Sequence, residues 1–278
     1  MNPQSFRERK SRWVKRKEIS KSSWMTSALL TNFHSSLTHI MGDTIERLYD
    51  QNLGLRPRLS MTESINQISA LRCELNKWRG NLSSCLQIVT SQDPLNDGHF
   101  TIDKIDNTRF NILLSLRYFE ARMLILRPLV GHYLDLPGRP ASNAHQPDGL
   151  LNTEAHLLSD VARTCGDILR ISKNLMTGSR KNKSLLGAWW FSRYYVFNSS
   201  LAILGILLIR KVPAYTKQTS SFSESELIRL IRKALDVICQ TKDGSETMMR
   251  CRDTLVTLIS GFDFHSKYTH AFLDTIYD

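Results

Sequence analysis

Glycine and proline are scarce in this sequence, with 13 and 8 copies among 278 residues. This low content excludes collagen-like, low-complexity and mostly disordered chains. It also argues against an all-β sandwich, because such folds need a turn signal about every 8–12 residues. No alternating strand pattern of useful length and no long internal repeat occurs either. These absences leave a globular chain built mainly from helices.

Local signatures of catalysis, phosphate binding and metal binding are also missing. The sequence contains no G-x-S-x-G, H-E-x-x-H, Walker-type, G-x-G-x-x-G or D-D-x-x-D motif, which argues against a hydrolase, a nucleotide enzyme or a terpene-type cyclase. His156 and Asp160 stand four residues apart on an expected helix, but no third metal ligand can be named. We therefore interpret them as an ordinary helix pair and predict no enzyme, no metal site and no cofactor in this chain.

The five cysteines are too widely spaced for a C-x-x-C zinc pair, and five is too few for a disulfide scaffold. They fall in expected helical segments or, for Cys85, shortly after one, and there cysteine usually behaves as a small buried apolar residue. We therefore expect reduced, buried thiols at Cys73, Cys85, Cys165, Cys239 and Cys251.

The excess of basic over acidic residues, 37 against 26, is concentrated at the N-terminus. The first 21 residues carry eight basic and two acidic side chains. We predict that residues 1–22 form a poorly ordered basic head, which imports the chain into the nucleus, contacts nucleic-acid phosphates weakly or serves solubility alone. The residues concerned are Arg7, Arg9, Lys10, Arg12, Lys15, Arg16 and Lys17. No apolar run follows these charges, so we expect no secretory signal.

Apolar residues recur at helical spacing over most of the remaining chain, which predicts an all-α array of seven or eight helices. Ser60 and Glu63 have the spacing of a capping box, and Pro128 is expected to end a helix. The expected helices cover residues 24–51, 60–80, 106–126, 152–176, 185–209, 223–239, 246–260 and 265–277. Residues 131–149 hold three prolines and three glycines, so they are expected to link a first half, 23–130, to a second half, 150–278.

The most apolar stretch runs from Tyr194 to Ile209 and carries no charge over 16 residues. A membrane-spanning helix needs about 20 apolar residues. Asn198, Ser199 and Ser200 also interrupt this one. We predict that the helix of residues 185–209 lies in the core. A helical membrane-associated protein that uses Tyr194–Ile209 is the alternative.

Several segments, taken in order along residues 24–260, resemble the regulatory domain of fungal zinc-cluster transcription factors. Leu116–Leu129 is similar to a helix that ends in Arg-Pro and an aliphatic residue, and Leu186–Phe197 to a Trp-bearing buried helix. Glu63–Leu82 resembles an earlier helix followed by Trp, and Ala234–Leu255 the closing helix pair. The residues on family positions are Trp78, Tyr118, Arg127, Pro128, Trp189, Trp190, Tyr194 and Phe197.

This resemblance implies a non-catalytic, all-α regulatory domain in residues 23–278, located in the nucleus, with the cytoplasm left open. It implies a small apolar effector or a protein partner, and a homodimer stays open. Arg127 and Pro128 would terminate a helix or contact a ligand anion, and Trp189 and Trp190 would pack in the core or line a ligand site.

The family's six-cysteine zinc cluster is absent from this sequence. We therefore expect the C-terminal part of the regulatory domain, truncated or without its DNA-binding head. Zinc is expected only with an upstream cysteine cluster, and DNA contact only through a missing upstream domain or weakly through the basic head.

Overall fold

The computed structural model describes residues 28, 31–50, 54, 57–83, 86–90, 102–135, 148–177, 189–212, 222–239 and 246–261. Within these ranges the chain forms seven helices and no strand, which confirms the all-α prediction. They are the helix of residues 31–49, α2 (Met61–Gly80), α3 (Ile102–Asp135), α4 (Asp148–Thr177), α6 (Trp189–Lys211), α7 (Glu224–Cys239) and α8 (Glu246–Gly261). The basic head and the expected helix 265–277 lie outside the described residues.

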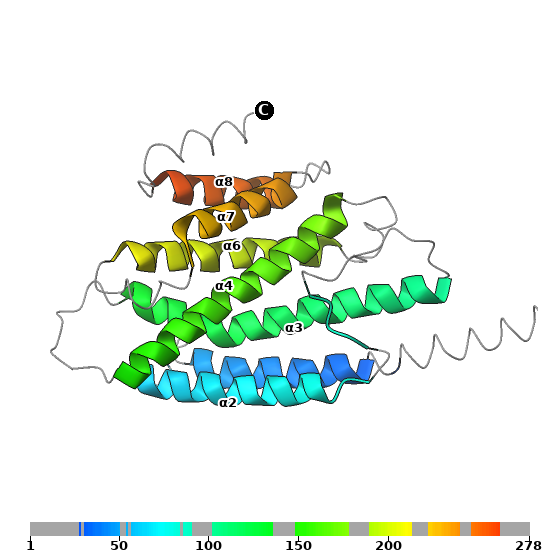
Figure 1. Cartoon of the computed structure of the whole chain (residues 1–278), viewed down its shortest axis with the longest axis horizontal. Coiled ribbons are helices and arrows are strands. Elements are labelled where there is room, and N and C mark those ends of the chain that lie inside the picture. The colour runs from blue at the N-terminus through cyan, green and yellow to red at the C-terminus, as the bar shows by residue number, and fades with distance from the viewer. Residues whose placement is uncertain are drawn as a thin grey trace, which may run out of the picture.

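The helices stack in layers, with α4 crossing the stack obliquely (Figure 1). The helix of residues 31–49 lies beside α2 at one end, and α8 lies at the other, packed on α7 and α6. Between them α4 packs against α3, α6 and α7. One continuous apolar core therefore joins the segments on both sides of residues 136–147.

The start of α2 shows how local sequence places a helix. Ser60 is its N-cap: the Glu63 amide donates to Ser60 Oγ at 3.3 Å, and the Ser60 amide donates to Glu63 Oε2 at 2.8 Å. The Ser60 hydroxyl also donates to Glu63 Oε2 at 2.7 Å, and the two hydrogen bonds that Ser60 donates to this carboxylate lower the pKa of Glu63. The capping box predicted from the sequence is confirmed, and it fixes the register in which Ile68, Leu71 and Leu75 are buried.

The helix α6 lies in the core, as predicted. Val196, Ile203 and Ile209 are at most 1% exposed. Two of its polar residues find partners within the helix: Asn198 Nδ2 donates to the Tyr194 carbonyl at 3.0 Å, and Ser200 Oγ donates to the Val196 carbonyl at 2.7 Å. No helix in the described ranges is long and apolar enough to cross a bilayer.

The expected helix end at Pro128 is wrong, because α3 continues through this proline to Asp135. The first five residues of the expected linker, 131–135, are therefore helical, and its last two, 148–149, already belong to α4. Arg127 consequently lies inside a helix, so it does not neutralise a helix C-terminus.

A hydrogen bond from another helix explains how α3 tolerates this proline. Pro128 has no N–H, so the carbonyl four residues earlier, on Leu124, loses its helical partner. Tyr49, on the helix of residues 31–49, donates its hydroxyl to that carbonyl at 2.7 Å. The phenol thus replaces the missing backbone donor.

Asp160 of α4 ties three helices together. Its side chain is 2% exposed and forms ion pairs with Arg72 of α2, Arg122 of α3 at 3.1 Å and Arg163 of α4 at 3.2 Å. His156 Nδ1 lies 3.8 Å from Asp160 Oδ2. The His156–Asp160 pair expected from the sequence is therefore the longest contact in a charge cluster that joins three helices.

We predict that Tyr49→Phe lowers the free energy of unfolding by about 1–2 kcal/mol, because the Leu124 carbonyl is left without a donor. In a Pro128→Ala background the same change should cost clearly less, since an alanine at this position supplies the helical N–H. Urea unfolding of the four proteins in this double-mutant cycle measures the coupling. Equal costs of Tyr49→Phe in both backgrounds would contradict the explanation.

Candidate functional site

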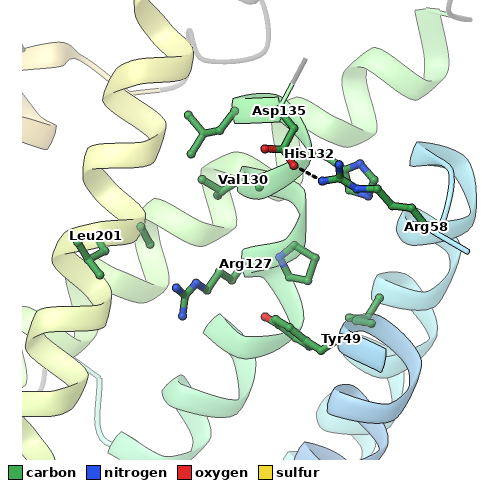
Figure 2. Close-up of a pocket in the computed structure, with 12 residues that line it drawn as sticks. Tyr49, Arg58, Arg127, Val130, His132, Asp135 and Leu201 are labelled. Carbon is green, nitrogen blue, oxygen red and sulfur yellow. Dashed lines mark hydrogen bonds and ion pairs between the residues drawn. The ribbon is translucent and has the colours of Figure 1, made fainter. Parts of the chain in front are cut away.

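A cavity of about 620 Å³ lies between the helix of residues 31–49, α3 and α6. Its apolar wall includes Leu48, Val130, Leu201 and Ala202 (Figure 2). The part of α3 that follows Pro128 forms another side. The cavity therefore depends on the continuation of α3 beyond its proline.

Most charged groups at this cavity are already paired. Arg58 forms an ion pair with Asp135, and His132 Nε2 lies 2.8 Å from Ser64 Oγ. Arg127 is exposed, and among the described residues it forms neither a hydrogen bond nor an ion pair. The lining thus carries one positive charge in excess.

Arg127 and Tyr49 face the same space. Figure 2 shows the Arg127 side chain extending from α3 toward α6, and the Tyr49 side chain extending from the helix of residues 31–49 toward α3. Burial raises the pKa of Tyr49, while the Arg127 guanidinium lowers it and Tyr194 raises it further. The phenol therefore stays protonated at neutral pH, as its hydrogen bond to Leu124 requires.

On α3, on the N-terminal side of Arg127, the acidic residue Glu120 is held by its own hydrogen-bond partners. Glu120 is 9% exposed and accepts a hydrogen bond from Arg117 at 2.9 Å. Tyr195 is also hydrogen-bonded to it. Burial raises the pKa of Glu120, and these two bonds oppose the shift. Its carboxylate is thus engaged within this cluster.

A glycine in α6 sets the distance between α3 and α6 at this place. A Cβ atom built on Gly205 would meet Val130 Cγ1 at 2.6 Å and Leu134 Cδ1 at 3.5 Å. Val130 is 4% exposed and β-branched, so its methyl group has little freedom to move. The close helix approach therefore requires glycine here.

The structure brings some of the family-position residues together. Trp78 and Tyr118 stack with ring centroids 6.0 Å apart, and Trp78 Nε1 donates to Ser36 Oγ at 2.9 Å. Arg127 and Pro128 line the cavity.

The other family-position residues lie on α6. Tyr194 is 56% exposed, and Phe197 packs partly buried against the core. Trp189 and Trp190 begin the helix, and their side chains lie outside the described part of the structure. The basic residues between Arg7 and Lys17 also lie outside it. Functional roles for all these residues stay predictions.

The cysteines are only partly where the sequence suggested. Cys165 is buried, but Cys73 and Cys239 are exposed and Cys251 is intermediate, so burial was wrongly expected for these three. Cys73 lies on the side of α2 opposite its buried residues, and Cys239 is the last residue of α7. Cys85 lies outside the described residues. Across the described ranges, no three His, Cys, Asp or Glu side chains gather as a metal site would require.

Sequence reasoning missed Tyr49, Gly205 and the cluster around Asp160. An isolated glycine inside an aliphatic helix does signal close backbone approach, so Gly205 could have been found. Nothing in the sequence connects Tyr49 with a carbonyl 75 residues away.

The chain is similar to fungal transcription factors. It is 27% identical to Transcription factor FBD3 of Gibberella moniliformis over 173 residues, which cover 61% of this chain and 22% of that protein. It is 29% identical to Transcription factor FBD3 of Fusarium pseudograminearum over 142 residues, which cover 50% of this chain and 18% of that protein. It is 24% identical to Activator of stress genes protein 1 of Candida albicans over 191 residues, which cover 65% of this chain and 18% of that protein.

The chain spans about a fifth of the length of these curated relatives. No protein-family profile matches it, and no solved structure does. The similarity supports a regulatory role in transcription.

We predict that Gly205→Ala lowers the free energy of unfolding by about 1–2 kcal/mol, because the added methyl group overpacks the α3–α6 contact. Gly166→Ala is the matched control in α4, where a Cβ would lie 3.7 Å from Leu230, an ordinary contact. It should be neutral or stabilise by up to about 1 kcal/mol through helix propensity. Urea unfolding of both variants tests this, and equal effects would contradict it.

Proposed function

We propose that this chain is a helical regulatory module of a fungal transcription regulator, which works in the nucleus by binding an effector or a protein partner and not by catalysis. The observation that carries the proposal is the similarity of half or more of the chain to gene regulators from three fungi. The all-α fold is consistent with it.

The cavity at Arg127 is the effector site in this proposal. Its volume of about 620 Å³ lies within the range of small-molecule sites, and its walls combine apolar side chains with a few polar groups. Three helices contribute to it: residues 31–49, α3 and α6. A ligand there would contact elements from the first and second halves of the chain, so its binding energy could alter their packing.

The basic residues from Arg7 to Lys17 would serve nuclear import in this proposal, or attract phosphate groups without sequence selectivity. The helical bundle itself is assigned no DNA contact and no zinc. Protein partners and a homodimer remain compatible with the proposed role.

We predict that the chain changes transcription when it is fused to a heterologous DNA-binding domain and tested on a reporter gene in a fungal host. Expression of the reporter gene should change several-fold relative to the DNA-binding domain alone, since a regulatory module acts through what it recruits or senses. A fusion that is abundant, folded and nuclear but leaves the reporter unchanged would contradict the proposal. Fluorescence from a tagged fusion reports location and abundance in the same cells.

A further inference from the structure

We propose that the cavity beside Arg127 takes a small molecule with an apolar body and a carboxylate, and that the Arg127 guanidinium holds this carboxylate. The inference rests on the proposed function, since it specifies the chemical class of the effector.

The first argument is the charge of the cavity. The Arg58 and Asp135 charges cancel each other, and Glu120 is engaged by Arg117 and Tyr195. Arg127 is left with no hydrogen-bond or ion-pair partner among the described residues, on a wall of the cavity. A guanidinium in this position can hold a carboxylate through two parallel hydrogen bonds.

The second argument is the apolar surface of the cavity. Leu134, on the part of α3 beyond Pro128, is 40% exposed, and Leu201 lies on the α6 side of the space that Arg127 enters (Figure 2). A small inorganic anion would leave this surface in contact with water. A neutral apolar molecule would take water from Arg127 and give no partner in return, which is unfavourable. A molecule with a carboxylate and an apolar body can pair with Arg127 and cover the apolar surface at the same time.

The role of Tyr49 is consistent with this assignment. Its only proton is committed to the Leu124 carbonyl, and burial keeps the phenol protonated. It can therefore offer its oxygen as an acceptor, or its ring as a surface, but not a second donor for an anion. The carboxylate is thus left to Arg127.

A second cavity carries no such excess of positive charge. That cavity, of about 400 Å³, lies between α4 and α7 and is lined by Arg163 and Arg170 together with Asp167 and Glu226. The two arginines and the two carboxylates of this lining leave it without net charge. It offers no comparable site for an anion.

The test measures binding of matched probes to the purified full chain by isothermal titration calorimetry. The probes are 4-phenylbutyrate and decanoate, each compared with the alcohol and the amine of the same carbon skeleton. We expect each acid to bind about tenfold or more tightly than its alcohol, because a hydrogen-bonded charge pair at a partly open site is worth about one factor of ten. The amines should bind more weakly than the alcohols.

Arg127→Gln should abolish the preference for the acid and leave the alcohol's affinity unchanged. Arg109→Gln is the matched control, an exposed arginine on the same helix that does not line the cavity, and it should keep the preference. Circular dichroism checks that both variants are folded.

Three outcomes would overturn the inference. They are equal binding of acid and alcohol, an acid preference that survives Arg127→Gln, and no binding of any probe. The proposed function fails separately, through an unchanged reporter in the fusion experiment. A regulated reporter together with no acid preference would therefore reject this ligand class alone.

Discussion

The hydrogen bond from Tyr49 to the Leu124 carbonyl is the interaction on which the candidate site depends. Without a donor at Leu124, the turn around Pro128 would have a partly buried carbonyl with no partner, and a proline inside a helix usually bends or breaks it. Because the phenol supplies the donor, α3 runs on to Asp135. Val130, His132 and Asp135, which line the cavity, lie on that continuation. The same bond places the Tyr49 ring at the cavity wall.

A second constraint fixes the other face of α3. Asp160 of α4 lies within reach of guanidiniums from α2 and α3, namely Arg72 and Arg122. A buried ion pair often contributes little net stability, because removing charges from water is costly. It does, however, penalise any register of the three helices that separates the charges. Tyr49 and Asp160 thus hold α3 from two sides, and the apolar core supplies most of the free energy of folding.

Much of the fold could be predicted from the sequence, because local rules govern helices. The capping box at Ser60 and the apolar spacing up to Trp78 place α2 correctly, and the uncharged run ending at Ile209 predicts the buried α6. The error at Pro128 has a physical reason: proline removes a local hydrogen bond, and the replacement comes from a residue 75 positions away. Likewise, local spacing along α4 can pair Asp160 with His156 and Arg163, but not with Arg72 and Arg122, which come from other helices. Of the candidate site, Arg127 and Pro128 were found from the resemblance, but the cavity they line required the three-dimensional structure.

The position of the cavity bears on regulation. A ligand shifts a conformational equilibrium only by the difference in its affinity for the two states. The turn of α3 around Pro128 has one side-chain hydrogen bond where other turns have a backbone bond, so its geometry depends on how the helix of residues 31–49 sits against it. On its far side this turn meets α6, where Gly205 leaves no space for adjustment. A molecule bound between Arg127 and Leu201 would touch α3 and α6 at this junction. Its binding energy would therefore act on one of the contacts that join the two halves of the chain, where a regulatory module can convert occupancy into a change of packing.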